Sequence, residues 1–546
     1  MRTGRMLMLA AILVAATCTQ GAEPKKAGAD GCGAGKPCAT PGNCYPTKLS
    51  TQRYTYFNRL KPMIPWGKDS NGKLTGEKLR PDEMRITFLG SAIPFARRAQ
   101  AEMSIFVEVG WDEAKNEPMD QFMFDLGAGT SGNYQAAKVG YARMDKIFIN
   151  HLHADHVNDV VQAYGFGPSG DRKSPLFLWG NKPSGVPNPG NSPVVTNAAV
   201  PVNNYSETPA YYDDGIVAFC RNLREALRWH TESQAFLTTA YVSFPTLDQL
   251  AQNWGLPYVP SVAGDDPAND AFAMIPIELD WWKTGLTEDG RPTGDNIAYN
   301  NAATGAKVLH YPVIHCRAGS MGYKLEWTSP KSGRTLTMVY SSDTKPEWNS
   351  VHHAINKDEQ GNPRGVDVFI HEMVPPAEIW AMKSMGLSTP GEGPLWERTV
   401  SAAKAVQNSS HTPQGAFGYM LSQINPRPRL AVATHFPVSD DLVACGMKSV
   451  QAHCPEIKRL GDRFVWSFDL MVVRVFPNRI EQRRAVVNDF SFNPPVPQLH
   501  QDLQAPKYHD ANGQWDPYFQ IDLTDGIQST ESGGNNGQPT FREDGY

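Results

Sequence analysis

Short apolar runs that end at a glycine or a polar residue recur along the chain. The first three are MRITFLGSAIP (84–94), MSIFVEVG (103–110) and QFMFDLGAG (121–129), each rich in β-branched and aromatic residues. Runs of this kind are typical of β-strands closed by turns. On the same grounds we expect further strands at residues 146–150, 174–180, 307–315, 336–343, 366–372 and 429–436.

Helical patterns lie between these predicted strands. Residues 215–236 place Phe219, Leu223 and Leu227 on one face, which is the spacing of an amphipathic helix. Residues 411–424 open with Thr412 as an N-cap and a proline at the first helical position. Strands that alternate with helices predict an α/β fold.

Composition changes along the chain divide it into four segments. We expect an export signal at 1–22, a flexible leader and N-terminal extension at 23–83, the main domain at 84–484 and a C-terminal tail at 485–546. Within the main domain, residues 185–310 are polar and punctuated by Pro and Gly, which predicts a large insertion between two strands.

The first residues have the pattern of a cleaved export signal. Arg2 and Arg5 precede an apolar run at 6–16, and small residues follow it. That run is too short to span a bilayer, and no later run is long enough. Cys18 could be a lipoprotein cysteine, but the AAT before it lacks the usual leucine. We therefore expect a periplasmic or secreted protein without a stable membrane span, and a lipoprotein is the less favoured alternative.

The chain is moderately charged and slightly acidic. Its formal net charge is −5, with 20% charged and 40% hydrophobic residues, which is typical of a globular protein. No basic block is long enough to hold a polyanion, so we expect a small-molecule substrate and no nucleic-acid partner. The aromatic helix of the predicted insertion and the long tail suggest a homodimer.

The stretch INHLHADHVND (150–160) gathers ligand-type side chains in one turn after a predicted strand. They are His151, His153, Asp155 and His156, in a chain with 14 histidines. Neutral imidazoles and carboxylates are good ligands for zinc-like ions. Because ligands so close in sequence cannot all reach one ion, we expect two ions that take further ligands from elsewhere.

Later predicted strands supply such ligands at their ends. His315 ends VLHYPVIH, Asp343 ends TMVYSSD, and His435 lies at the end of LAVATH. Three ligand-type residues in equivalent positions predict a shared site at one edge of the sheets.

Five motifs in this order resemble those of the metallo-β-lactamase-fold hydrolases, in particular the branch with tRNase Z and secreted arylsulfatases. They are HLHADH, VIHCRAGSMGYKLE, VYSSDTKP, FIHEMV and ATHF, and they span about residues 84–480 apart from the insertion. FGPSGDRKSPLFLWG is in addition similar to a bacterial subgroup of guanitoxin-biosynthesis metallo-hydrolases. The chain departs from the family at LGSAIPF, where a glycine-rich opening is usual, and at SSDT, where glycine usually precedes the aspartate.

The resemblance implies an αββα sandwich with two divalent metal ions at its rim. It assigns one ion to His151, His153 and His315, the second to Asp155, His156 and His435, and the bridging position to Asp343. We expect zinc, because diiron members of this fold usually carry glutamate at the position of His153. Asp125 in FDLGAG either supports the ligand turn from behind or caps a strand end.

Two such ions would activate a bridging water for hydrolysis, with Asp155 orienting it. The resemblance implies that His371 and Glu372 assist protonation of the leaving group; the alternative is a buried histidine held by the glutamate. His411 is either structural or close to the metals. His352 and His353 are expected to be solvated, His230 to pack, and Cys316 to be a small core residue.

We therefore expect an exported dinuclear hydrolase of a small phosphodiester, sulfate ester or lactone. The alternatives are an iron-dependent oxidoreductase on the same fold and a tRNase Z-like phosphodiesterase that acts on nucleic acid.

Overall fold

The computed structural model describes residues 54–186, 212–234 and 245–487, apart from residues 70, 95–98, 264–269, 282, 294–295 and 414. The predicted export signal and nearly all of the predicted tail lie outside these residues and stay predictions. Among the described residues, no helix is both long enough and apolar enough to cross a bilayer.

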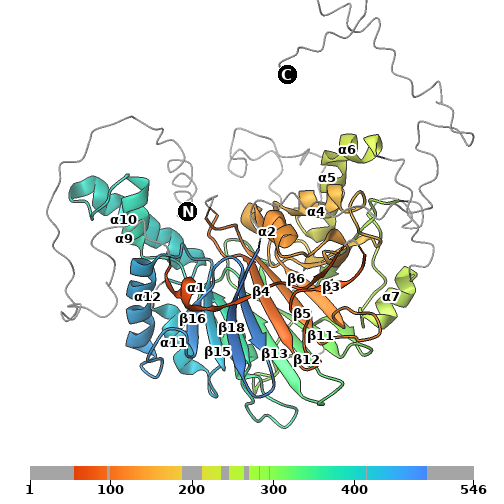
Figure 1. Cartoon of the computed structure of the whole chain (residues 1–546). Coiled ribbons are helices and arrows are strands. Elements are labelled where there is room, and N and C mark those ends of the chain that lie inside the picture. The colour runs from red at the N-terminus through yellow and green to blue at the C-terminus, as the bar shows by residue number, and fades with distance from the viewer. Residues whose placement is uncertain are drawn as a thin grey trace, which may run out of the picture.

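Two large sheets and a small hairpin form the framework of the described part (Figure 1). The first sheet has, in spatial order, β1 (Lys61–Met63), β18 (Ile480–Ala485), β17 (Met471–Val475), β4 (Met84–Gly90), β5 (Ser104–Val109), β6 (Asp120–Phe124), β7 (Lys146–Phe148), β8 (Leu176–Asn181) and β9 (Met274–Leu279). The second has β10 (Ile297–Asn301), β11 (Ala306–Pro312), β12 (Met321–Thr328), β13 (Thr335–Tyr340), β14 (Val368–Glu372), β15 (Leu430–Thr434) and β16 (Phe464–Trp466). The hairpin pairs β2 (Gly67–Lys68) with β3 (Leu74–Thr75).

Helices lie outside both sheets. On the side of the first sheet are α2 (Thr130–Ala136), α3 (Ala154–Val157), α4 (Val160–Phe166), α5 (Ile216–Ala226) and α6 (Arg228–Ser233). On the side of the second are α8 (Trp348–Ile355), α9 (Ala377–Ser384), α10 (Gly393–Ser410), α11 (Ala416–Gln423) and α12 (Asp440–His453). The short helices α1 (Tyr56–Arg59) and α7 (Leu247–Asn253) lie at the periphery.

Aromatic side chains from both sheets meet in the core between them. Phe124 of β6 contacts Tyr323 of β12 and Tyr340 of β13, with ring centroids 5.7 and 6.3 Å apart. A second core, with Ile147 and Ile216, packs α4 and α5 against the outer face of the first sheet. Burial on both faces of each sheet confirms the αββα sandwich predicted from the sequence.

The direction of the strands places the functional residues. The pairs β6–β7 and β7–β8 are parallel, and so are β13–β14, β14–β15 and β15–β16. Carboxyl ends of parallel strands meet at one edge of a sheet. The loops after β7, β13, β14 and β15 therefore gather at one rim, the upper one in Figure 1.

Three boundaries differ from the sequence-based expectation. The range 185–310, predicted as an insertion, contains β9 and β10 of the two large sheets. Residues 54–83, predicted as part of the extension, carry α1 and β1, and β1 pairs with β18. The helix expected from 411 begins instead at Ala416 behind Gly415, whose φ is 85°. Thr412 is no N-cap, because its hydroxyl donates to the Thr344 carbonyl oxygen at 2.7 Å.

Candidate metal centre

The histidine turn follows β7 and is fixed by hydrogen bonds of Asn150 and by a close backbone approach at Gly127. The amide N–H of Asn150 donates to Asp125 Oδ1 at 2.9 Å, and its side chain donates to the Met321 carbonyl oxygen at 2.6 Å. A Cβ on Gly127 would lie 2.0 Å from the carbonyl oxygen of Asp155, so this close approach requires glycine. The chain is thus held where the turn leaves the sheet.

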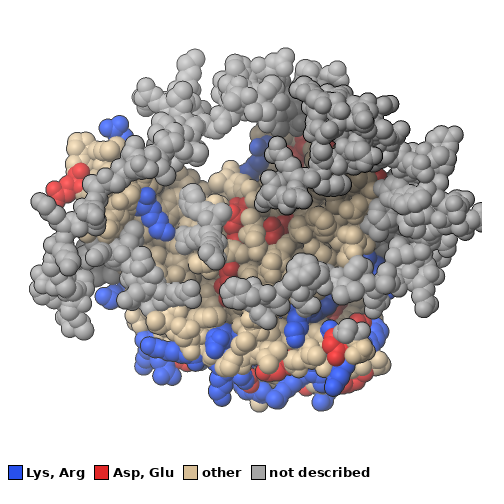
Figure 2. All heavy atoms as spheres, turned by 45° about the horizontal axis from the view of Figure 1, so that its top comes forward, with Lys and Arg blue, Asp and Glu red and all other residues tan. Residues whose placement is uncertain are grey.

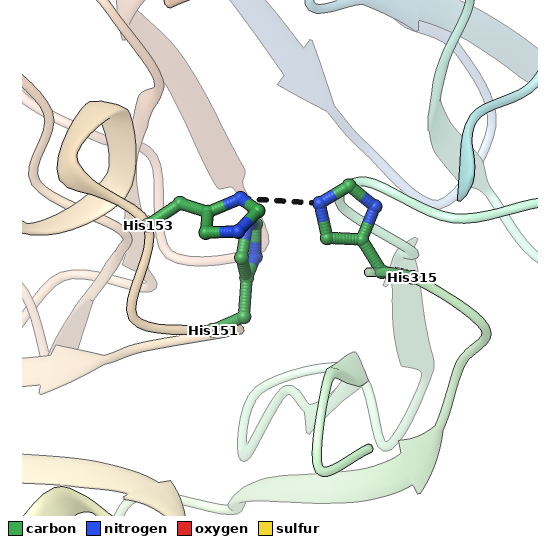
Figure 3. A group of neighbouring side chains, drawn as sticks. All are labelled: His151, His153 and His315. Carbon is green, nitrogen blue, oxygen red and sulfur yellow. Dashed lines mark hydrogen bonds between the residues drawn. The ribbon is translucent and has the colours of Figure 1, made fainter. Parts of the chain in front are cut away.

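His151, His153 and His315 form the first group of candidate ligands (Figure 3). Each offers a ring nitrogen, and these nitrogens all lie within 4.8 Å of one another. His153 Nδ1 is 3.2 Å from His315 Nε2. His315 comes from the loop after β11, so two distant segments meet here.

Asp155, His156, Asp343 and His435 form the second group, also within 4.8 Å of one another. His435 Nε2 lies 3.1 Å from Asp155 Oδ2, and His156 Nε2 lies 3.5 Å from the same oxygen. All four side chains are buried. His435 directly follows β15 with a φ of 53°, a left-handed conformation that turns the chain toward the rim.

Asp343 lies between the two groups. Its Oδ1 is 3.6 Å from His156 Nε2, and its Oδ2 is 3.5 Å from His435 Nε2 and 3.9 Å from His315 Nε2. One carboxylate therefore reaches ligand atoms of both groups. This is the arrangement that the bridging position requires.

The donor set fits divalent cations. Both ring nitrogens of His151, Nε2 of His156 and Oδ1 of Asp343 are buried without a hydrogen-bond partner among the described residues, which is costly unless an ion binds them. Burial lowers the pKa of His151 far below its usual value and that of His153 to about 4. Both imidazoles are thus neutral near pH 7, as metal ligands must be.

Groups behind the candidate ligands fix their orientation. His156 Nδ1 donates to Asp125 Oδ2 at 2.8 Å, and His315 Nδ1 donates to the Ser410 carbonyl oxygen at 2.8 Å. In each ring the proton on Nδ1 leaves Nε2 free to coordinate an ion. Asp125 therefore supports the ligand turn, the first of the two roles considered for it.

His371 is not placed to transfer a proton at this site. It is fully buried, its Nε2 donates to Thr412 Oγ1 at 2.9 Å, and its Nδ1 is hydrogen-bonded to Ser341 Oγ. Since the Thr412 hydroxyl hydrogen goes to a carbonyl oxygen, His371 must donate to it, and both ring nitrogens are used. This position does not support the predicted catalytic role of His371. His371 is buried as the alternative expected, but Ser341 and Thr412 hold it, not Glu372.

Glu372 instead holds His411, which the sequence analysis left undecided. His411 Nδ1 donates to Glu372 Oε2 at 2.9 Å and lies 3.9 Å from Asp343 Oδ2. Burial lowers the pKa of His411, but the negative charge of Glu372 outweighs it and raises the pKa above its usual value. The same Glu372 oxygen is 3.6 Å from Nδ1 of His435. In the sequence, His411 was marked only by its position directly before Thr412.

We expect the His371→Ala substitution to destabilise the protein. Two buried hydroxyls, of Ser341 and Thr412, would lose a partner, at a cost of about 2–3 kcal/mol in the free energy of unfolding. Urea unfolding measures this change, with His352→Ala as the matched control because His352 is only half-buried. A His371→Ala protein with unchanged unfolding free energy would contradict the structural role.

The structure confirms the expectation for His230 and contradicts those for His353 and Cys316. His353 is buried and stacks on Tyr311 with ring centroids 4.0 Å apart, so the expectation that it is solvated was wrong. His230 packs as expected, with Nε2 2.8 Å from the Gly165 carbonyl oxygen. Cys316 is exposed, not a core residue, because its loop lies at the rim.

Comparison with known proteins finds short sequence matches to ribonucleases Z. The chain is 32% identical over 108 residues to ribonuclease Z of Methanothermobacter thermautotrophicus, a match covering 19% of this chain and 30% of that protein. It is 30% identical over 148 residues to ribonuclease Z of Brevibacillus brevis, covering 25% of this chain and 43% of that protein. The chain thus spans less than half of the length of these curated relatives. No protein-family model matches the chain.

Among solved structures, the short form of human tRNase Z aligns over 72% of this chain and 99% of its own, with 15% identity and a TM-score of 0.32. Likeness at this level adds no argument about activity.

Proposed function

We propose that the chain is a metal-dependent phosphodiesterase that cleaves RNA, on the basis of its sequence similarity to ribonucleases Z and of the geometry of its candidate ligands. The observation that carries this proposal is Asp343, whose two oxygens face ligand atoms of the two groups. Two ions that share a carboxylate are suited to in-line displacement at phosphorus.

We propose zinc in both positions, held by the seven side chains of the two groups. Imidazole and carboxylate ligands suit zinc among the common divalent ions. When bound, the ions would supply Lewis-acid activation of water and would neutralise charge on the phosphoryl oxygens.

The protein's own residues would divide the proton transfers. Burial alone would raise the pKa of Asp155, but the neighbouring imidazoles of His156 and His435 hold it below its usual value, so Asp155 is ionised and can orient the attacking water. His411, with Nδ1 bound to Glu372, keeps its other ring nitrogen for the leaving oxygen. Glu372 positions His411 and would stabilise its protonated form, which is the role of the carboxylate behind a catalytic histidine.

The expectation that nucleic acid is no partner was wrong, because the curated relatives that match the chain are ribonucleases. That expectation rested on net charge and on the lack of a basic block. On the face shown in Figure 2, most visible Lys and Arg side chains lie along the lower edge of the described surface, and Asp and Glu are visible both at that edge and nearer the middle. Metal ions at the rim would hold the scissile phosphate without a basic patch around it.

Cleavage of a labelled RNA oligonucleotide by the zinc-loaded protein tests the proposal. The matched substrates are a DNA oligonucleotide of the same sequence and the simple diester methyl p-nitrophenyl phosphate. We expect RNA and the simple diester to be hydrolysed. Turnover of p-nitrophenyl sulfate or a lactone, with no turnover of either diester, would overturn the proposal.

Removing the metals should abolish this hydrolysis and lower the melting temperature by about 5 °C or more. The physical reason is that ions bound only by the folded state stabilise it, while the buried histidines and carboxylates lose their partners without them. Calorimetry after treatment with a chelator, and again after adding zinc, measures the change. Full activity in thoroughly metal-free protein would contradict the proposal.

A further inference from the structure

A cavity of about 310 Å³ adjoins the first group of ligands. Its walls include His151, His153 and His315 on one side and the beginning of α5 on the other, with Gly215, Phe219 and Asn222. A part of the substrate bound in this cavity would lie directly beside the scissile phosphate at the candidate ligands. The volume is at the lower end of ligand pockets, which suits one small unit rather than a helical duplex.

Asn181, at the end of β8, gives this cavity a buried polar anchor. Only 6% of the residue is exposed, and its Nδ2 donates to the Lys182 carbonyl oxygen at 3.0 Å. Its Oδ1 is buried with no hydrogen-bond partner among the described residues. Asn181 lines the cavity with this amide, and a rotation of its side chain would bring Oδ1 to a donor on a ligand.

The loop after His315 approaches Asn181 closely at Gly319. The φ of Gly319 is 103°, and a Cβ there would lie 3.1 Å from Asn181 Nδ2. Both the conformation and the tight space favour glycine. The absence of a side chain at this position keeps the wall beside Asn181 open.

The charges around the cavity are balanced. Arg317 Nη2 is 2.6 Å from Asp214 Oδ2, and Ser184 Oγ donates to the same carboxylate oxygen at 2.7 Å. Asp213 pairs with Arg221 at 2.6 Å. With each carboxylate paired to a guanidinium, the walls favour an uncharged group that forms hydrogen bonds over a second phosphate.

One wall is apolar and aromatic. Leu152 and Ala218 line it together with the half-buried Phe219. A flat aromatic side chain beside amide groups is the usual protein surface for a nucleobase, which stacks on the ring and bonds through its edge. We propose that this cavity is a subsite for one nucleoside next to the scissile phosphate, an inference that rests on the proposed phosphodiesterase function.

Three substrates that share a p-nitrophenolate leaving group test the subsite. They are thymidine 5′-p-nitrophenyl phosphate, thymidine 3′-p-nitrophenyl phosphate and methyl p-nitrophenyl phosphate. In the wild type we expect kcat/KM for at least one thymidine diester to exceed that for the methyl diester by tenfold or more. Hydrolysis of the methyl diester with no preference for either thymidine diester would overturn the subsite and leave the proposed function intact.

The variants Asn222→Ala and Phe219→Ala locate the preference in the cavity. Asn222 is exposed, so its loss should be tolerated by the fold. We expect either substitution to reduce the thymidine-to-methyl ratio of kcat/KM at least fivefold. Asn253→Ala, an exposed asparagine on α7, is the matched control and should keep the ratio. Equal ratios in all three variants would contradict the assignment.

A binding measurement keeps the inference testable if no diester is hydrolysed. We expect thymidine 5′-monophosphate to bind the zinc-loaded wild type at least tenfold more tightly than inorganic phosphate, and Asn222→Ala to reduce that difference. Equal affinities for the nucleotide and for phosphate would overturn the nucleoside subsite. Nucleotide binding without any hydrolysis would overturn the phosphodiesterase function alone.

Discussion

The Asp343→Ala variant is expected to lose at least about a thousandfold in kcat/KM for RNA and for the simple diester. Asp343 is the carboxylate whose oxygens lie 3.6 Å from His156 and 3.9 Å from His315, so its removal disturbs both groups. A thousandfold loss corresponds to about 4 kcal/mol of transition-state stabilisation, within the several kcal/mol that metal ions supply. Initial rates with saturating zinc measure the effect.

Two further variants separate this loss from misfolding. Asp343→Asn keeps the shape of the side chain but removes the charge, and we expect a loss nearly as large. Asp248→Asn changes an exposed aspartate on α7 and should keep full activity. A soluble, folded Asp343→Ala protein with more than a tenth of the wild-type rate would refute a shared-carboxylate mechanism.

The His411→Ala variant is expected to lose about a hundredfold or more in kcat on RNA while retaining its metals. A positioned general acid contributes about 10²–10⁴-fold when the leaving group is a poor one. The alkoxide that leaves RNA needs a proton, whereas p-nitrophenolate does not. We therefore expect a loss of less than about tenfold on methyl p-nitrophenyl phosphate, measured in parallel with metal content.

The leaving-group comparison identifies the role of His411. Equal losses on both substrates would indicate that His411 supports the metals or the fold instead of protonating the leaving oxygen. His352→Ala is the matched control, because His352 is half-buried on α8 and belongs to none of the candidate ligand groups. Glu372→Gln should show the same leaving-group pattern in weaker form, since Glu372 acts through His411.

The candidate ligands could be predicted because their signals are local. Each of His151, His315, Asp343 and His435 lies at or just beyond the end of an apolar run, and parallel strands deliver such ends to one edge. Asp343 and His435 follow β13 and β15, which begin within one residue of the predicted strands and end three and two residues earlier. Spacing and strand ends were enough to propose which side chains meet.

The contact between His411 and Glu372 could not be predicted, because it depends on long-range packing. His371 and Glu372 are neighbours in sequence, but side chains of a strand alternate between its faces. His371 accordingly lies in the core beside Ser341 and Thr412, and Glu372 faces the rim. His411 reaches Glu372 only because α9 and α10 return the chain to the rim.

The insertion was too broadly predicted for a related reason. The strand MIPIEL of β9 lies in a polar context rich in Pro, Gly and Asp, and its pairing partner β8 is far away in sequence. The error about nucleic acid has a different cause. Net charge describes the whole surface, whereas a phosphodiester at this rim would be held by a few metal ligands.

The central claim is that one rim of the sandwich holds two metal ions that share Asp343. Anomalous diffraction from crystals of the purified, zinc-loaded protein tests it most directly. We predict two anomalous peaks per chain, one among His151, His153 and His315 and the other among Asp155, His156 and His435, with Asp343 between them. A single peak, or peaks away from these side chains, would contradict the claim.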